Sequence, residues 1–346
     1  MDEQLLVQKI MSTMRAVTVA SHTLGPKLCD VKMPVPGADE VLVRVECAPA
    51  TTFERLQCFT KVFTPPLVLG VQASGTIVSA GEGVPAGAVN KKVVVFRYVD
   101  PGKIVEPGWK GFWCQYVVMK YEDVYVYSQQ IPHSQACLMY GAPLTALGLF
   151  RDLVPKPGLG VLLSPGASTI SKILMRLLRR IGVPVVSLVR SQTSVDVLLR
   201  LGQTAANIIR LGDPEIEKSV QTATKDIRRW VLVDAVGHDS IVKVFRAMPE
   251  GAEYILYGAL GGVESISINP EVLVRDRKSI RGYYLSYGPE GAKKGIRSDL
   301  DVVDKDLKAG GEIFGTPVVK EYPMGDFMKA IEEQPAIASR GRGVLY

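Results

Sequence analysis

Apolar residues recur along the middle of this 346-residue chain in two patterns, one uninterrupted and one with the period of a helix. Residues 161–163 read Val-Leu-Leu, as expected of a strand that is buried on both faces of a parallel sheet. Six apolar residues then follow one helical face, at positions 170, 173, 174, 177, 178 and 181. This stretch predicts a strand, a short turn and an amphipathic helix that packs on the sheet.

The same alternation continues to residue 260. Further strands are predicted at 185–189, 231–236 and 254–260, and further helices at 136–150, 195–201 and 239–248. Parallel strands joined by helices need right-handed crossovers, so these elements predict an α/β domain with a doubly wound sheet of the Rossmann type. We place this domain at residues 131–280.

The chain on either side carries another pattern. Prolines and glycines punctuate the first 130 residues. Short strands are predicted there at 41–45, 68–78, 92–96, 116–119 and 124–127. Residues 1–130 therefore read as a small all-β domain. Residues 281–346 carry mixed signals, with helices predicted at 300–309 and 324–333, and we assign them to a return of the chain to the first domain.

Composition narrows the class of protein. Hydrophobic residues make up 47% and charged residues 22% of the chain, which favours a folded protein of two domains over a disordered one. No apolar run reaches the roughly 18 residues that a membrane-spanning helix needs. The acidic start, Asp2 and Glu3, is unlike a secretory leader. The five cysteines have no paired spacing, which predicts reduced thiols and no disulfide. We therefore expect an intracellular protein, located in the cytoplasm or, after processing, in the mitochondrion.

The turn that follows the first strand of the sheet is the main candidate for a ligand site. Backbone N–H groups at the start of the next helix could hold a pyrophosphate there. The candidate cofactor-binding residues in this turn are Ser164, Gly166, Ser168, Thr169 and Ile170. Ser168 and Ser171 stand where a dinucleotide fingerprint has its second and third glycines. The alternative interpretation is a serine-capped helix that binds no ligand.

The second strand of the sheet ends with Arg190 and Ser191. Folds that prefer NAD place an Asp or Glu at this position to hold the ribose hydroxyls. A guanidinium instead suits a 2′-phosphate, to which it can bind bidentately, and the serine hydroxyl adds a donor. The pattern favours NADP(H), and the alternative is a solvated arginine at a strand end.

A metal site is not indicated. The three histidines, His22, His133 and His238, are far apart in the sequence, and none shares a helical face with a cysteine or carboxylate. Chelation would require distant residues to converge. We therefore expect no zinc.

Several segments resemble the medium-chain dehydrogenase/reductase superfamily over nearly the whole chain. Residues 70–78, Gly-Val-Gln-Ala-Ser-Gly-Thr-Ile-Val, are similar to a Gly-x-Glu-x-x-Gly segment of its GroES-like domain, and residues 111–117 to its Gly-Thr-Trp-Ala-Glu-Tyr strand. Zinc-binding relatives have Cys and His-Glu where this chain has Thr51, Val71 and Gln72. The resemblance is therefore to the zinc-free branch of quinone oxidoreductases and mitochondrial trans-2-enoyl-CoA reductases.

Four segments carry the resemblance to that branch. Residues 142–146 resemble its Asn-Pro-x-Thr-Ala, and residues 280–284 its Leu-Arg-Gly-Phe-Trp, while residues 257–260 also suggest the branch. Residues 233–237 match the strand whose end faces the nicotinamide. The resemblance thus adds Gly237, Gly258 and Tyr283 to the candidate cofactor-binding residues.

The resemblance implies hydride transfer from NADPH to the β-carbon of an activated alkene, either a 2-enoyl thioester or a quinone-like substrate. Enoyl reductases use a tyrosine as proton donor in a Gln-Gly-x-Tyr context, and this chain has Gln57-Cys58-Phe59-Thr60 there. Thr60 and Tyr140 are the candidate catalytic residues by position. The resemblance also implies a homodimer that pairs edge strands near Ser265 to Ile268.

Two other classes of function stay open. A relative that has lost catalysis could serve as a scaffold or ribonucleoprotein-associated protein, which the missing glycines and the missing tyrosine favour. Nucleic-acid binding is a weaker hypothesis. The net charge of +6 includes basic clusters at 176–180 and 275–281, but no aromatic-plus-basic motif accompanies them.

Overall fold

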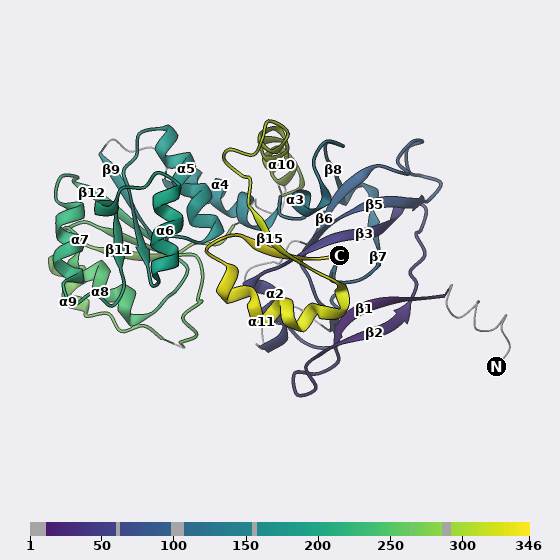
Figure 1. Cartoon of the computed structure of the whole chain (residues 1–346), viewed down its shortest axis with the longest axis horizontal. Helices are drawn as coiled ribbons and strands as arrows, with labels where there is room; N and C mark the ends of the chain where they lie inside the picture. The colour runs from purple at the N-terminus through teal and green to yellow at the C-terminus, as the bar shows by residue number, and fades with distance from the viewer. Residues whose placement is uncertain (1–11, 60–62, 98–106, 154–157, 264, 286–291) are drawn as a thin grey trace. The chain divides into compact units, whose positions relative to one another are not determined.

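The structure is a computed structural model that describes residues 12–59, 63–97, 107–153, 158–263, 265–285 and 292–346. The chain forms two compact units (Figure 1). Unit 1 comprises Met1–Pro143 and Tyr287–Tyr346, and unit 2 comprises Leu144–Ser286. Among the described residues, no helix is both long enough and apolar enough to span a bilayer.

Unit 2 is built on a six-stranded sheet in which every pairing is parallel. The strands lie in the order β11-β10-β9-β12-β13-β14. Their bounds are β9 (Leu159–Ser164), β10 (Val185–Val189), β11 (Ile208–Arg210), β12 (Arg229–Asp234), β13 (Glu253–Leu256) and β14 (Ser279–Gly282). Every residue of β9 and β10 is buried, as their apolar runs predict. The doubly wound α/β fold is confirmed.

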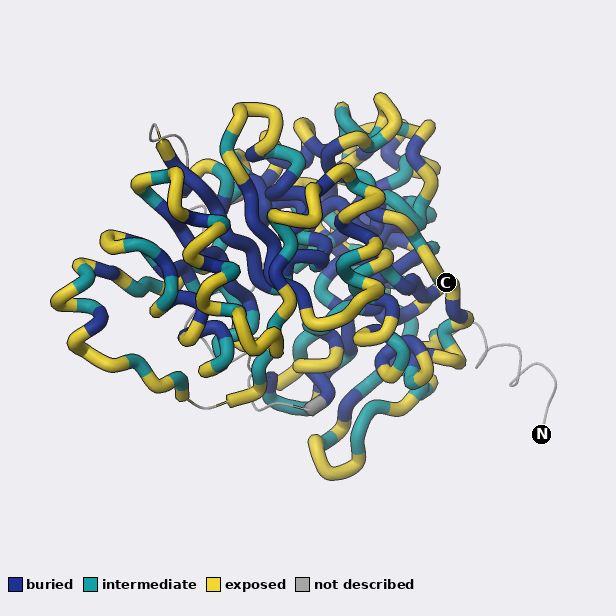
Figure 2. Tube along the Cα trace, turned by 60° about the vertical axis from the view of Figure 1, so that its left-hand side comes forward, coloured by how far each residue is buried: buried dark blue, intermediate teal, exposed yellow. Residues whose placement is uncertain are grey.

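Helices cover both faces of this sheet (Figure 1). They are α5 (Thr169–Arg180), α6 (Gln192–Arg200), α7 (Ile216–Thr224), α8 (Asp239–Ala247), α9 (Pro270–Arg275) and the short 3-10 helix η2 (Ala205–Asn207). Val220 of α7 and Phe245 of α8 share one core cluster with Leu162, Val186 and Leu232. Side chains alternate along a strand, so the other set faces α5 and α6. Buried residues of both units are dark blue in Figure 2.

Several elements of unit 2 differ from the sequence prediction. The patterning does not predict β11, α7 or β14, because β11 and β14 are short and α7 buries only Val220 and Thr224. The strand expected at 254–260 ends at Leu256. Residues 265–269 are not assigned to a strand within the single chain, and β14 is the edge of the described sheet on that side.

Unit 1 holds a seven-stranded and a three-stranded sheet. The larger sheet has the strand order β15-β16-β3-β5-β6-β8, and its seventh strand, β7, pairs with β3. The smaller sheet has the order β2-β1-β4. The bounds are β1 (Thr13–Val19), β2 (Pro26–Lys32), β3 (Glu40–Ala50), β4 (Leu67–Val68), β5 (Gln72–Ala80), β6 (Lys92–Phe96), β7 (Tyr116–Lys120), β8 (Tyr125–Val126), β15 (Val318–Tyr322) and β16 (Arg342–Leu345). The C-terminal strand β16 pairs antiparallel with β3 and thereby extends the N-terminal sheet.

Helices also occur in unit 1, and two of them, α2 (Thr52–Phe59) and the 3-10 helix η1 (Tyr121–Asp123), lie within the first 130 residues, so that segment is β-rich and not all-β. The others are α3 (His133–Ala136), α10 (Ala292–Lys308), α11 (Phe327–Ile337) and the 3-10 helix η3 (Met324–Asp326), while α4 (Gly141–Leu153) begins in unit 1 and lies mostly in unit 2. The single helix expected at 136–150 is divided into α3 and α4. A reciprocal cap opens α2. Thr51 accepts the N–H of Phe53 at 3.0 Å, and Glu54 accepts the N–H of Thr51 at 2.8 Å.

Candidate functional site

The carboxyl ends of all six strands of unit 2 lie at one edge of the sheet, because the strands are parallel. Most of the cofactor-binding residues predicted from the sequence follow directly after these ends. Ser164 ends β9, Arg190 follows β10, Gly237 follows β12 and Tyr283 follows β14. Open α/β sheets bind ligands at this edge, where β9 and β12 lie at the point of strand-order reversal.

Gly166 lets the turn after β9 lie directly against β10. Its N–H donates to the carbonyl of Leu188 at 2.7 Å. A Cβ atom on this residue would lie 2.5 Å from the Cβ of Ser187 and 3.0 Å from its Cα. Only glycine fits this contact without displacing β10. The predicted importance of this glycine thus has a packing cause that needs no ligand.

Ser168 is the N-cap of α5. Its hydroxyl oxygen accepts the N–H of Ser171 at 3.1 Å and donates to the Ser171 hydroxyl at 3.0 Å. Within the described part of the chain, no acceptor is assigned to the N–H groups of Thr169 and Ile170. The two serines that replace the fingerprint glycines therefore use one amide of the helix start, and two amides stay available to an anion.

Two hydroxyl groups in the same turn are buried without a hydrogen-bond partner among the described residues. They are Oγ of Ser164, a residue that is fully buried, and Oγ1 of Thr169, a residue that is 3% exposed. A buried hydroxyl without a partner costs free energy. The turn thus carries unmet donors and acceptors beside a helix start, and this arrangement fits a pyrophosphate.

The end of β10 presents Arg190, and Ser191 then caps α6. The Ser191 hydroxyl accepts the N–H of Ser194 at 3.2 Å. Arg190 is exposed, and its guanidinium has no ion pair with any residue that the structure describes. Its position and its charge are compatible with a phosphate ligand, and the Ser191 hydroxyl is already engaged in the cap.

Asp234 organises the loop that follows β12. Its buried carboxylate accepts the N–H of Val236 at 2.9 Å, the N–H of Gly237 at 2.7 Å and the hydroxyl of Tyr254 at 2.9 Å. Burial and the adjacent carboxylate raise the pKa of Tyr254, so that hydroxyl stays protonated and donates. Sequence patterning did not single out Asp234 as a functional residue, although an Asp at a strand end is a recognisable signal.

The loops after β12 and β13 pack closely on each other. The N–H of Leu260 donates to Ala235 at 2.8 Å, and that of Gly261 donates to Val236 at 2.6 Å. Gly237 has a φ of +61°, a conformation that favours glycine. A Cβ on Gly258 would lie 3.0 Å from the carbonyl oxygen of Ala235. The two predicted glycines therefore shape this part of the edge.

Tyr283 turns toward α4. Its backbone N–H donates to Leu256 at 2.7 Å. A Cβ built on Gly148 would lie 2.1 Å from the tyrosine hydroxyl, so that hydroxyl lies against the helix. The backbone of Tyr283 lies at the carboxyl edge, and the end of its side chain packs on α4.

The candidate catalytic residues belong to unit 1. Tyr140 is 8% exposed and stacks on Phe96, with ring centroids 4.4 Å apart and planes inclined by 14°. Beside it, Gln72 accepts the N–H of Gly141 at 2.7 Å and so fixes the start of α4. Thr60 lies outside the described residues. The structure therefore gives a packed setting for Tyr140.

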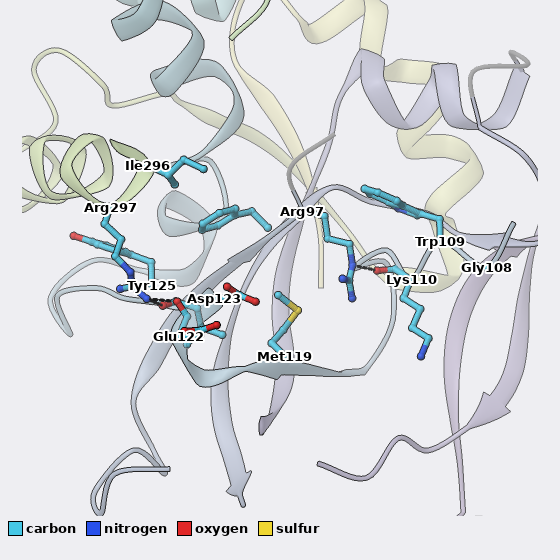
Figure 3. A pocket seen from close by; sticks show the side chains of 12 residues that line it. Arg97, Gly108, Trp109, Lys110, Met119, Glu122, Asp123, Tyr125, Ile296 and Arg297 are labelled. Atoms are coloured by element: carbon cyan, nitrogen blue, oxygen red, sulfur yellow. Dashed lines mark hydrogen bonds between the residues drawn. The ribbon is translucent and has the colours of Figure 1, made fainter. Parts of the chain in front are cut away.

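Phe96 also lines a cavity of ≈ 550 Å³ within unit 1 (Figure 3). Arg97 lies on its wall, donates to the carbonyl of Lys110 and lies over the ring of Phe112 at 5.4 Å. Burial lowers the pKa of the Arg97 guanidinium. Met119 contributes an apolar wall. Tyr140 stacks on the same Phe96 ring, so the candidate proton donor lies one aromatic ring away from this cavity.

Thr51 and Gln72 stand where the resemblance to zinc-binding dehydrogenases would place metal ligands, and both have other contacts here. Thr51 belongs to the cap of α2, and Gln72 binds the start of α4. Among the described residues, no three His, Cys, Asp or Glu side chains come together in a group that could hold a metal ion.

Glu54 is a buried acid that the sequence analysis did not single out. It is fully buried, and its Oε1 has no hydrogen-bond partner among the residues described. Burial raises the pKa of this carboxyl, while hydrogen bonds from Thr51 act in the opposite direction. Cys58, one turn later, has its thiol pKa raised to about 12 by burial. The Thr-x-x-Glu spacing of a capping box was the signal for Glu54.

Known proteins resemble this chain in sequence. Residues 37–129 match the family model of the alcohol dehydrogenase GroES-like domain. The quinone oxidoreductase of Mus musculus is 21% identical over 337 residues, which cover 94% of each chain. An acryloyl-coenzyme A reductase of Sulfurisphaera tokodaii is 34% identical over 91 residues, which cover 26% of this chain and 27% of that protein.

Solved structures share the fold. A mycobacterial protein complexed with NADPH has a TM-score of 0.76 at 17% identity, over 96% of this chain and 99% of that one. A cobalt- and zinc-bound alcohol dehydrogenase of Pyrobaculum aerophilum has a TM-score of 0.76 at 21% identity, over the same shares. Because the fold occurs both with NADPH and with zinc, the chemistry has to be argued from this chain's own residues.

Proposed function

The chain belongs to the medium-chain dehydrogenase/reductase superfamily, and we propose that it is an oxidoreductase that uses NADPH to reduce an activated alkene, a 2-enoyl thioester or a quinone-like substrate. The quinone oxidoreductase and acryloyl-coenzyme A reductase relatives support this substrate class. The observation that carries the proposal is the turn after β9, with two unassigned amides and two buried hydroxyls without partners.

The residues of unit 2 would bind and orient the cofactor. The N–H groups of Thr169 and Ile170 would hold the pyrophosphate, and Arg190 would hold the 2′-phosphate. Asp234 would keep Gly237 and its loop in place near the nicotinamide. Bound NADPH would supply a hydride to the β-carbon of the alkene.

The residues of unit 1 would complete the reduction. The carbonyl of the substrate gains negative charge as the β-carbon is reduced, and a hydrogen-bond donor has to stabilise that charge. A proton then has to reach the α-carbon. We assign these roles to Tyr140, with Thr60 as the alternative. The proposed reaction uses no zinc, because Thr51 and Gln72 replace ligands and have structural contacts of their own.

The proposal includes a homodimer in the mitochondrion or the cytoplasm, as the resemblance to the zinc-free branch implies. The resemblance implies pairing near Ser265 to Ile268, and β14 is the edge strand of the described sheet on that side. Size-exclusion chromatography with light scattering would measure the mass in solution, and a monomer at all concentrations would reject this part.

A second candidate function is that of a scaffold without catalysis. Its specific support is the Ser168 cap, which accepts the N–H of Ser171 at the helix start without a ligand. A scaffold predicts a folded protein that neither binds nor oxidises NADPH, whereas the reductase predicts both.

The reductase proposal is tested by following the transfer of the hydride from NADPH to the substrate. Purified protein is incubated with NADPH that carries deuterium at its reactive carbon and, in separate reactions, with crotonyl-CoA and a simple quinone. We expect oxidation of NADPH with crotonyl-CoA and deuterium at the β-carbon of the saturated product. Absence of NADPH oxidation with both substrate classes would reject the proposal.

A further inference from the structure

A positive charge without a carboxylate partner lies on the wall of the unit 1 cavity of ≈ 550 Å³. Arg97 directly follows β6, and its side chain is partly buried. Its Nε donates to the carbonyl of Lys110, and its Cζ lies 5.4 Å from the ring centroid of Phe112. Arg97 forms no ion pair with any residue that the structure describes. Its two terminal nitrogens therefore face the cavity wall without a described acceptor.

Burial of this guanidinium is not compensated by the described residues. Burial lowers the pKa of Arg97, while Cys114 and Asp123 act in the opposite direction. A charge that loses water without gaining a partner costs free energy. An anion inside the cavity would supply the missing charge, because a guanidinium binds a carboxylate through two parallel N–H donors.

The other charged side chains of the cavity limit the charge of such a ligand. Lys110 lies on the same side as Arg97, and its exposed side chain has no ion pair with a described residue (Figure 3). Glu122, Asp123 and Arg297 line the opposite side. Among the described lining residues, three basic and two acidic side chains leave one positive charge in excess. The cavity therefore suits a ligand with a single negative charge better than a dianion.

Much of the remaining wall is apolar. Met119 of β7 and Ile296 of α10 are buried, and the rings of Phe96 and Trp109 also line the cavity. The volume falls within the range of small-molecule sites, about 300–1,000 Å³. Apolar walls bind an apolar body by removing its surface from water. The lining as a whole thus fits an apolar molecule with one negatively charged end.

We propose that this cavity binds a small amphipathic carboxylate, with its carboxylate on Arg97 and Lys110 and its apolar part against Met119 and Ile296. The site goes beyond the proposed reduction and requires no dinucleotide. Tyr140 is not among the described residues that line it, so the ligand does not occupy the place of the proposed proton donor.

The test compares three probes that share one apolar body and differ in charge. Isothermal titration calorimetry measures the binding of octanoate, octanol and octylamine to the purified full chain. Octanoate should bind saturably at one site per chain, and octanol about tenfold or more weakly. Octylamine should bind no better than octanol. No binding of octanoate up to millimolar concentration overturns the proposal, and so does an equal or tighter affinity for octanol or octylamine.

Two variants test the positive charges. Arg97→Gln should weaken octanoate binding about tenfold or more and leave octanol binding unchanged. Lys110→Glu places a negative charge on the same side and should also weaken octanoate binding. The Lys110 side chain is exposed and only its backbone carbonyl holds Arg97, so this variant keeps that contact.

Arg55→Gln is the matched control, because Arg55 is an exposed arginine of α2 that does not line the cavity. It should leave the affinities of all three probes unchanged. Circular dichroism establishes that each variant is folded, and Lys110→Glu decides the outcome if Arg97→Gln is not. Octanoate affinity that stays at the wild-type value in the folded charge variants overturns the assignment of the carboxylate to this cavity.

Discussion

Glu54 makes the stability of the protein depend on pH. Burial raises the pKa of this carboxyl in the folded state. Such a group stabilises the fold below its unfolded pKa of about 4.3 and loses that contribution as the pH rises through its folded value. Ionised Glu54 would leave Oε1 charged and without a described partner. The folded protein should therefore lose stability through this residue as the solution becomes less acidic.

Glu54→Gln tests this expectation. The amide keeps an oxygen that can accept from Thr51, and it cannot ionise. The melting temperature of the variant relative to the wild type should rise as the pH is raised above the unfolded pKa of about 4.3. Thermal melts at a series of pH values above it measure this difference, with the exposed Glu321→Gln on β15 as the control. A difference that stays constant with pH would contradict the buried charge.

Gly166→Ala tests the close contact between the turn and β10. The added Cβ would lie 2.5 Å from Ser187, whose backbone belongs to the sheet. We expect a loss of about 1–3 kcal/mol in the free energy of unfolding, measured by urea denaturation. Gly282→Ala is the control, because a Cβ there meets nothing within 4 Å. Equal stability of Gly166→Ala and the wild type would show that the contact relaxes at no cost.

The sequence indicated some individual residues and not others. The positions of Gly166 and Arg190 at the ends of β9 and β10 were predictable, because these strands are strongly apolar, while their roles toward a cofactor stay predictions. The burial of Glu54 was not, because a capping box forms on exposed and on buried helices alike. The contact of Tyr283 with Gly148 joins residues far apart in the sequence, so no local pattern reveals it.

At the scale of elements, Asp234 joins β12 to the loop before α8 and to β13. Asp234→Asn puts an amide N–H₂ where the carboxylate accepts the N–H groups of Val236 and Gly237. We expect a loss of about 1–3 kcal/mol, measured by denaturant unfolding. Tyr254→Phe removes one hydrogen bond of the three and should cost less. If the tyrosine variant costs as much as Asp234→Asn, the loop contacts of Asp234 do not contribute.

Long, regularly patterned elements were predictable, and short ones were not. β10 was predicted at the residues where it lies, because all five of its residues are buried. β11 has three residues and one buried side chain, and it forms because β10 offers it a partner. The helix pattern at 136–150 missed the break before Gly141, where Gln72 binds the backbone from β5.

At the scale of the whole molecule, the sequence pattern changes near residues 130 and 280. The chain passes from unit 1 to unit 2 between Pro143 and Leu144, and it returns to unit 1 between Ser286 and Tyr287. The physical reason at the first boundary is tertiary contact. The stacking of Tyr140 on Phe96 connects the segment before α4 to β6 of unit 1. Hydrophobic periodicity reports secondary structure and does not report such partners.

The fold of both units could thus be anticipated in outline, and the candidate site only in part. The carboxyl edge followed from the parallel strands. The hydroxyl groups of Ser164 and Thr169, which are buried without described partners, became visible only in three dimensions. The question they leave is whether this edge binds a dinucleotide.

One titration answers it most directly. Increasing NADPH is added to the purified protein, and nicotinamide fluorescence and the melting temperature are followed, with NADH as the comparison. We predict saturable binding, tighter for NADPH than for NADH, and a melting temperature that rises with the logarithm of NADPH concentration. No change in either signal with NADPH or NADH, up to millimolar concentration, would contradict the account.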